Sequence, residues 1–234
     1  MRLTVKDVSD FLNVSTKTIY RWVTAKGLPS YRFNNQYFFS RAEIIEWATE
    51  NRIPLHRDVL LEIDKDVKEF PPFLTAMEDG GIYYRIQGSN KNEVLRNIVN
   101  NLKLPAEVDR DFIFEMLRAR EMLGTTAIGQ GIAIPHPRSP IIQYIETPSV
   151  NLCFLEKPID FGAQDGEKVF ALFTIFSTSV RVHLYLLSRL SYLLHNQDFM
   201  LTLRTQSPRD EILKAAKSAE LTLKPVTMFD PASE

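Results

Sequence analysis

Residues 124–138 read GTTAIGQGIAIPHPR, in which two closely spaced glycines precede an apolar run that ends in Pro135 and His136. A neutral imidazole nitrogen is nucleophilic near pH 7, so His136 is a candidate for covalent chemistry. Gly129 and Gly131 lack a Cβ, which would let the backbone approach such a site closely. A histidine without context is more often structural, so a functional role for His136 has to be judged from the sequence around it.

The residues on either side of this stretch alternate between helical and strand-like patterns. We expect helices at 73–79, 89–102, from Pro105 onward, at 180–195 and at 207–218, and strands at 82–86, 149–155 and 168–176. The last of these strands is nearly all apolar, as a central strand would be. The alternation predicts an α/β domain with a mixed sheet flanked by helices on both faces.

The first fifty residues follow a different pattern. Thr4 with Asp7 three positions later predicts a helix start, and Ser15 predicts a second start after a tight turn. The second helix has an apolar inner face that includes Trp22, which we expect in the core, and a polar, basic outer face. This order predicts a helix-turn-helix.

A hairpin and a third helix follow. Residues 31–33 and 36–39 are strand-prone runs separated by Asn34 and Asn35, which tolerate positive φ. Ser40 with Glu43 predicts a second capping box and a helix whose Trp47 lies in the core. Helix, turn, helix, hairpin and helix together form a small winged helix-turn-helix domain, which we place at residues 1–50.

The N-terminal charge distribution is uneven although the whole chain carries a formal charge of −1. No acidic residue occurs between Asp10 and Glu43, while five basic residues fall in that interval: Lys17, Arg21, Lys26, Arg32 and Arg41. A phosphate backbone requires such a basic surface. A solvated face without a partner is the alternative, and charge alone does not separate the two.

The remaining sequence features bound the class of protein. The 234 residues suit one or two domains, and the longest apolar runs are far below the ~20 residues of a membrane-spanning helix. No signal peptide is evident, and the single Cys153 excludes an internal disulfide, so we expect a soluble cytoplasmic protein without membrane insertion. Residues 51–72 are expected to be a linker and 221–234 a tail. No Cys/His cluster has metal-ligand spacing, so no metal or other cofactor is expected, and His56 and His195 show no functional context.

The N-terminal segment resembles the excisionase/MerR-type DNA-binding domain in its element order, its tight turn and the residues 15–21 and 38–41. The resemblance implies that the second helix enters the major groove while the hairpin reaches the adjacent backbone or minor groove. The implied DNA contacts are Thr16, Lys17, Thr18, Tyr20, Arg21, Arg32, Asn34 and Asn35. The same small fold also serves as a protein-interaction module.

Residues 73–220 resemble the enzyme IIA domains of the phosphotransferase system, of the fructose/mannitol and nitrogen-regulatory type. The resemblance rests on Glu121, on the pair Ile128 and Gly129, and on the IAIPH core that ends in His136. Further matches downstream include Asp165 and His183. One departure is Pro137, because the family pattern usually has a small residue, most often Gly, at that position.

The resemblance implies a phosphoryl acceptor at His136, served by an HPr-like phosphocarrier protein, and an assisting histidine at His183. The candidate phosphate contacts are Gly129, Gly131, Ser177, Ser179 and Arg138. Ser177 and Ser179 precede a helix whose N–H groups and dipole favour an anion. Arg138 is equally well read as a surface charge, and His183 without the resemblance as a histidine at the edge of the core.

Three functions remain open from the sequence. The favoured one is a DNA-binding regulator of transcription, whose IIA domain is phosphorylated on His136 and which acts as a monomer or a homodimer. The second is a histidine phosphocarrier that passes the group to a transporter IIB component, which would be the only enzymatic activity expected. In the third, Pro137 lacks the N–H that would face a phosphoryl group, and the IIA-like domain only binds a regulatory target protein.

Overall fold

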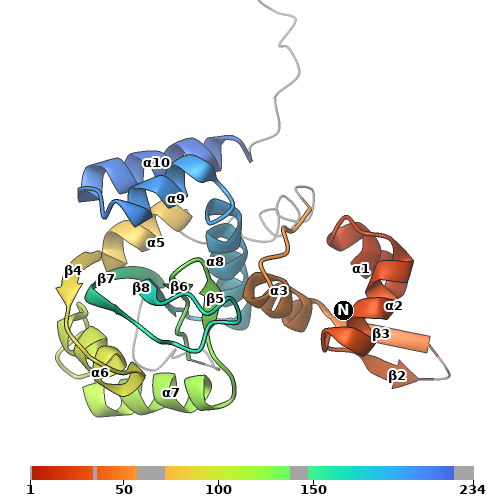
Figure 1. Cartoon of the computed structure of the whole chain (residues 1–234), viewed down its shortest axis with the longest axis horizontal. Helices are drawn as coiled ribbons and strands as arrows, with labels where there is room; N and C mark the ends of the chain where they lie inside the picture. The colour runs from red at the N-terminus through yellow and green to blue at the C-terminus, as the bar shows by residue number, and fades with distance from the viewer. Residues whose placement is uncertain (1, 34–35, 57–71, 138–146, 224–234) are drawn as a thin grey trace, which may run out of the picture.

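The computed structural model of the chain describes residues 2–33, 36–56, 72–137 and 147–223. The N-terminal domain (residues 2–56) and the sheet domain (residues 72–223) lie side by side, with α3 between the sheet domain and the remaining N-terminal elements (Figure 1). The expected linker lies mostly in residues 57–71, outside the described part, as does most of the expected tail.

The N-terminal domain has the expected order of elements. Its antiparallel sheet has the strand order β1-β3-β2, and β2 and β3 form the predicted hairpin. The helix-turn-helix prediction is therefore confirmed, with β1 as an addition. The elements are β1 (Arg2–Thr4), α1 (Val5–Phe11), α2 (Thr16–Ala25), β2 (Tyr31–Phe33), β3 (Gln36–Ser40) and α3 (Arg41–Glu50).

Two of the three helix caps predicted in the N-terminal domain form. Thr4 and Asp7 make a reciprocal capping box at the start of α1, and the Ser15 hydroxyl accepts a bond from the Thr18 N–H at the start of α2. The predicted capping box of α3 was wrong, because Ser40 makes no side-chain cap bond. The Glu43 carboxylate instead accepts a 2.6 Å hydrogen bond from the Tyr31 hydroxyl on β2.

Helix α3 belongs to the core of the N-terminal domain through one face. Trp47 packs on Trp22 of α2 with ring centroids 5.3 Å apart, and its Nε1–H donates to the Lys26 carbonyl at 3.1 Å. Both tryptophans are buried, which confirms the expected core role. The position of α3 is thus fixed relative to the second helix of the helix-turn-helix.

The sheet domain contains the predicted mixed sheet. Its strand order is β4-β7-β8-β6-β5, in which β4 is parallel to β7 and β6 to β8, while the other neighbours are antiparallel. The strands are β4 (Ile82–Ile86), β5 (Ala127–Gly129), β6 (Ile132–Ala133), β7 (Ser149–Ile159) and β8 (Val169–Phe176). The central β8 is almost wholly buried, as its apolar sequence predicted.

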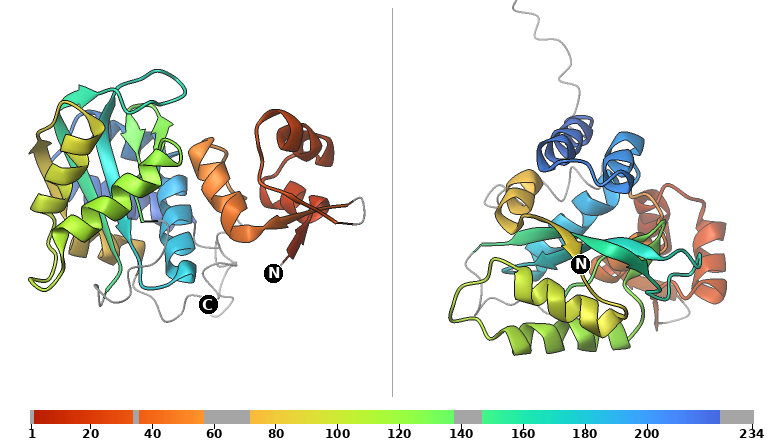
Figure 2. Two further views of the ribbon diagram at one scale, coloured as in Figure 1. Left: turned by 90° about the horizontal axis from the view of Figure 1, so that it is seen from below. Right: turned by 60° about the vertical axis from the view of Figure 1, so that its left-hand side comes forward.

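Helices cover both faces of this sheet (Figure 2). On one face, α6 (Lys91–Asn101) and α7 (Arg110–Met122) enclose a core that includes Cys153. The other face carries α5 (Phe73–Gly80), α8 (Val180–Leu193), α9 (Gln197–Arg204) and α10 (Arg209–Leu221). The predicted start at Ser89 was one residue early, because Asn90 caps α6. In the described residues, no helix is both long and apolar enough to cross a membrane.

The apolar core does not stop at the boundary between the domains. One continuous cluster joins the core of the N-terminal domain to the α8 side of the sheet. Figure 2 shows α3 lying against α8 at this junction, and α3 also contacts β5. The N-terminal domain is therefore packed on α8 and on β5, which belongs to the GTTAIGQGIAIPHPR stretch.

Candidate functional site

The structure brings the two candidate histidines together. His136 follows β6, and His183 lies in the first turn of α8, whose N-cap Ser179 accepts a bond from the Val182 N–H at 3.1 Å. The two rings lie 4.9 Å apart between centroids. Both residues are buried, with exposures of 5% for His136 and 8% for His183.

Hydrogen bonding and burial set the state of the His136 ring. Its Nδ1 lies 2.7 Å from the Ile134 carbonyl oxygen, which can only accept, so Nδ1 carries the proton in the neutral ring. The lone pair therefore belongs to Nε2. Burial, with the neighbouring His183, lowers the pKa of His136 to about 3, and burial with the positive charge of Arg120 lowers the pKa of His183 to about 4. Both rings are neutral near pH 7, as a nucleophile requires.

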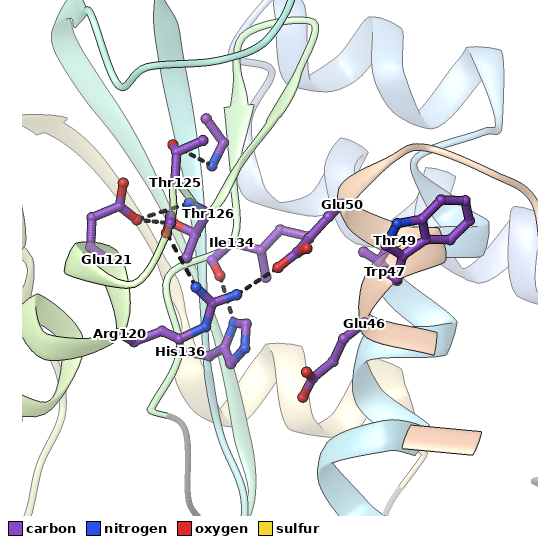
Figure 3. Close-up of polar contacts among 12 residues, drawn as sticks. Glu46, Trp47, Thr49, Glu50, Arg120, Glu121, Thr125, Thr126, Ile134 and His136 are labelled. Carbon is purple, nitrogen blue, oxygen red and sulfur yellow. Dashed lines mark hydrogen bonds and ion pairs between the residues drawn. The ribbon is translucent and has the colours of Figure 1, made fainter. Parts of the chain in front are cut away.

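Helix α3 of the N-terminal domain covers this pair. The Glu50 carboxylate forms a 2.6 Å salt bridge with Arg120 of α7, and Glu46 Oε1 lies 4.0 Å from His183 Nε2. Figure 3 shows Glu46 and Glu50 reaching from α3 toward the sheet domain, while Trp47 points to the other side of the helix. A small cavity remains beneath α3, lined by Glu46, Thr49, Glu50, Arg120, Thr126, Ile128, Ile134, His136 and Leu187.

Arg52 makes a second contact between the domains, just after α3. Its guanidinium donates to the Gly129 carbonyl at 3.1 Å, to Gln130 Oε1 at 2.9 Å and to the Leu194 carbonyl at 3.3 Å. His195 also approaches this segment: its Nε2 lies 3.1 Å from the Arg52 carbonyl oxygen, while its Nδ1 lies 2.7 Å from the Ser191 carbonyl oxygen. His195, for which the sequence showed no functional context, thus contributes to the contact that holds the N-terminal domain in place.

Glu121 supports the segment that leads into β5. Its carboxylate accepts bonds from the Thr126 N–H at 2.9 Å and the Thr126 hydroxyl at 2.7 Å, and it pairs with Lys91 Nζ at 2.8 Å. The carboxylate is buried and its contacts are with backbone and side chains of the sheet domain. The acidic residue of the motif therefore positions the chain that carries Ile128, a residue of the cavity wall.

The candidate phosphate contacts are placed as follows. Gly129 and Gly131 form the β5–β6 turn at positive φ, where an added Cβ would meet Asp165 at 2.6 Å and Phe170 at 2.4 Å. Ser177 is buried directly after β8, and Ser179 caps α8, so the two serines flank the start of the helix that carries His183. Arg138 lies outside the described residues.

Most of the candidate DNA contacts are accessible. Thr16, Lys17, Tyr20 and Arg21 of α2 and Arg32 of β2 are exposed, and Thr18 is half-buried, with its hydroxyl 2.9 Å from that of Ser15. Figure 1 shows α1 and α2 on the far side of α3 from the sheet domain. Asn34 and Asn35 lie outside the described residues.

Sequence reasoning missed the residues that cover the histidines. Glu46 and Glu50 belong to a different domain from His136, and no spacing rule connects them. The available signal is the four-residue spacing of Glu46 and Glu50, which puts the two carboxylates on one face of α3. With His183, the structure gathers ligand atoms of Glu46 and His136 within 4.8 Å of one another, a cluster that spacing could not reveal.

Comparisons with known proteins match both parts of the chain. The family model described as "Phosphoenolpyruvate-dependent sugar phosphotransferase system, EIIA 2" matches residues 77–219, and the helix-turn-helix domain model matches residues 2–52. A nitrogen regulatory protein of Pseudomonas aeruginosa is 38% identical over 132 residues, which cover 55% of this chain and 82% of that protein. A nitrogen regulatory protein of Escherichia coli strain K12 is 30% identical over 145 residues, covering 59% of this chain and 85% of the relative.

The fold comparison agrees with the sequence comparison. The crystal structure of the nitrogen regulatory protein IIA-Ntr from Neisseria meningitidis superposes with a TM-score of 0.51 at 26% identity, covering 61% of this chain and 94% of that one. Residues 77–219, which match the EIIA 2 family model, contain His136 after β6 and His183 at the start of α8. This chain belongs to the EIIA 2 family of the phosphoenolpyruvate-dependent sugar phosphotransferase system and carries a helix-turn-helix domain ahead of its IIA domain.

Proposed function

We propose that this protein is a phosphotransferase-system-linked regulator in which phosphorylation of His136 controls the helix-turn-helix domain. One observation carries the proposal: α3 serves both parts of the molecule. Trp47 on one side of α3 packs on Trp22 of the second helix of the helix-turn-helix, while Glu46 and Glu50 face the histidine pair. A movement of α3 away from His136 therefore moves the DNA-binding module with it.

The proposed transfer uses the free lone pair of His136. Nε2 attacks the phosphorus of a phosphohistidine on an HPr-like carrier, forming a new N–P bond while the carrier's N–P bond breaks. The Ile134 carbonyl holds Nδ1–H and so keeps Nε2 as the nucleophile. His183, 4.9 Å away between ring centroids, assists as a donor to the developing phosphoryl charge. Ser177, Ser179 and the N–H groups at the start of α8 supply further donors.

Access to His136 requires an open state. In the conformation described above, α3 covers a histidine that is only 5% exposed, so a carrier reaches it only after α3 has moved away. The protein then exists in closed and open states, and the carrier acts on the open one. The contacts of Arg52 and the salt bridge between Glu50 and Arg120 favour the closed state.

The charge of the phosphoryl group opposes closure. A phosphorylated His136 would carry about −2 charges close to the carboxylates of Glu46 and Glu50. Two unit charges about 5 Å apart repel by about 3 kcal/mol at an effective dielectric constant near 20. This exceeds the contribution of a partly exposed salt bridge, about 1–2 kcal/mol, so phosphorylation favours the open state. The DNA-binding module is then released from its fixed position on the IIA domain.

DNA is the proposed partner of the released module. Lys17 and Arg21 are exposed on the outer face of α2, as contacts to phosphates and base edges require. The proposed regulator acts in the cytoplasm, where phosphotransferase carriers would reach it, and a homodimer would place two such modules on one site.

The test of this function is phosphoryl transfer followed by DNA binding. We expect acid-labile, alkali-stable label on the wild-type protein after incubation with phosphoenolpyruvate, enzyme I and HPr, and none on His136→Gln. DNA affinity at constant salt should differ between phosphorylated and unphosphorylated protein. Label that survives His136→Gln would move the acceptor elsewhere. A wild-type protein that takes no label would contradict the proposal and favour an interaction module.

A further inference from the structure

Three potential metal ligands converge where the two domains meet. Glu46 comes from α3, His136 from the segment after β6 and His183 from α8, and one ligand atom of each lies within 4.8 Å of the other two. We propose that these residues bind one Zn²⁺ ion and that the ion fastens the N-terminal domain to the IIA domain.

The donor set suits zinc. Two imidazole nitrogens and one carboxylate oxygen form a three-ligand site in which a water takes the fourth tetrahedral position. Mg²⁺ and Ca²⁺ prefer sets made of oxygen alone, so the two histidines disfavour them. Tetrahedral ligands about 2.0 Å from zinc are about 3.3 Å from one another. The cluster must therefore contract slightly, and Glu46, whose side chain is 40% exposed, is the least buried of the three ligands.

The orientation of the histidines is the one that a metal needs. His136 is held at Nδ1 by the Ile134 carbonyl, a hydrogen bond of the kind that orients metal-bound histidines through their second nitrogen. This leaves the lone pair on Nε2. The atom of His183 that approaches Glu46 is likewise Nε2, at 4.0 Å from Oε1.

The charges around the cluster allow a cation. Glu46 contributes −1, so bound Zn²⁺ would leave a net charge of +1 at the three ligands. Arg120 is the cation that faces both histidines, and its salt bridge with Glu50 offsets the repulsion that it would exert on zinc. Glu50 lines the same cavity as His136, so this neutral pair lies beside the site.

The site belongs to the closed state alone, because it takes ligands from both domains. Opening removes Glu46 and leaves two histidines. Zn²⁺ should therefore bind the closed state more tightly than the open state. The ratio of these two affinities sets how far bound Zn²⁺ shifts the equilibrium toward the closed state. A bound ion would also occupy Nε2 of His136, the atom that accepts the phosphoryl group. This last consequence, mutual exclusion of zinc and phosphorylation, rests on the proposed function, whereas zinc binding itself does not.

Zinc binding is measured on the metal-free full-length protein, without any phosphoryl donor. Zn²⁺ is titrated in competition with a chromophoric chelator, and Co²⁺ replaces it to report geometry through the strong visible absorption of tetrahedral cobalt. We expect one ion per chain and tetrahedral cobalt. Glu46→Gln and His183→Gln should each weaken binding at least about tenfold, the loss typical of even outer-shell changes. Glu43→Gln is the matched control, since this carboxylate on the same helix faces Tyr31.

The inference fails if no equimolar binding of Zn²⁺ is found, or if Glu46→Gln binds as tightly as the wild type. Circular dichroism of each variant shows whether it is folded, and a folded Glu46→Gln with unchanged affinity would place the ion elsewhere. Phosphorylation of His136 in the presence of EDTA is measured separately. Phosphorylation of His136 without zinc binding would overturn this inference and leave the proposed function standing. Zinc binding without phosphorylation would support this inference and overturn the proposed function.

Discussion

The Glu50 carboxylate and the Arg120 guanidinium form a 2.6 Å salt bridge between α3 of the N-terminal domain and α7 of the IIA domain. The Arg120 side chain is 12% exposed and that of Glu50 is 39% exposed, so the pair is partly withdrawn from water. This bridge lies on the wall of the cavity that contains His136. The association of the two domains and the burial of the candidate phosphoryl acceptor therefore depend on the same contacts.

Removing the Glu50 charge should destabilise the protein. Glu50→Gln leaves Arg120 without its carboxylate, and we expect a loss of about 1–2 kcal/mol in the free energy of unfolding, between the values for exposed and buried pairs. Urea denaturation measures it. The control is Glu115→Gln, whose exposed bridge with Arg118 should contribute less than about 0.5 kcal/mol. Equal effects of the two substitutions would show that the contact between the domains does not depend on Arg120.

Removing the Arg52 contact between the domains should speed phosphorylation of His136. Arg52→Ala removes three hydrogen bonds to the IIA domain. If the closed state is thereby destabilised by about 1.4 kcal/mol relative to the open state, the open population rises about tenfold. The initial rate of labelling by phosphorylated HPr should rise accordingly. Arg209→Ala, which removes only a 3.3 Å bond to the Glu78 carbonyl within the IIA domain, serves as control. Identical rates for wild type and Arg52→Ala would mean that α3 does not limit access.

Stability should fall as the pH is lowered below about 6.5. The pKa values of His136 and His183 lie near 3 and 4 in the closed protein, whereas the unfolded chain protonates histidine near 6.5. Between these values the unfolded state binds more protons, so acid favours it, by up to about 2 kcal/mol for one histidine at pH 5. The groups facing the rings are Glu46, Glu50 and Arg120.

Urea unfolding at pH 7.5 and pH 5.0, with EDTA present, measures this dependence. The His136→Gln/His183→Gln double variant should show a smaller difference between the two conditions. If the double variant loses as much stability as the wild type, other groups cause the acid sensitivity.

Cys153 should resist thiol reagents in the native protein. It is fully buried in the core between the sheet and helices α6 and α7, and this burial raises the pKa of its thiol far above the usual range. Reaction with an aromatic disulfide reagent should therefore occur only on unfolding, at a rate that increases with urea in step with the loss of circular dichroism. Rapid reaction in buffer would show that the sheet opens locally.

The basic residues of α2 should contribute to DNA binding through phosphates. Lys17→Ala and Arg21→Ala should each reduce the slope of log affinity against log salt by about 1. The control is Lys217→Ala, an exposed lysine on α10 of the IIA domain. A slope that stays the same in the α2 variants, or no DNA binding at any salt, would favour a protein partner for the N-terminal domain.

Most of the architecture could be predicted from the sequence because its signals are local. The Thr4 capping box, the Ser15 cap and the apolar β8 each depend on neighbouring residues, and all three appear as expected. Strands β5 and β6 were missed because they have three and two residues, too few for periodicity to be visible. Helix α9 was missed as well, since its cap at Asn196 follows α8 almost directly.

The candidate site could be predicted only in part. The IAIPH stretch pointed to His136, and the resemblance to enzyme IIA domains pointed to His183. Glu46 and Arg120 could not be found, because their roles arise from the packing of α3 on the IIA domain, which neither sequence pattern encodes alone. The Ser40 capping box failed for a related reason, since the Glu43 carboxylate bonds to Tyr31 on a neighbouring strand.

Phosphorylation of His136 should separate α3 from the IIA domain. Energy transfer between dyes at Lys6→Cys on α1 and Lys217→Cys on α10 measures this separation, since both positions are exposed and the native Cys153 is buried. We expect transfer efficiency to fall on full phosphorylation and to return when the phosphoryl group is removed, with no change in His136→Gln. Unchanged transfer in a fully phosphorylated protein would show that phosphorylation leaves the two domains in contact.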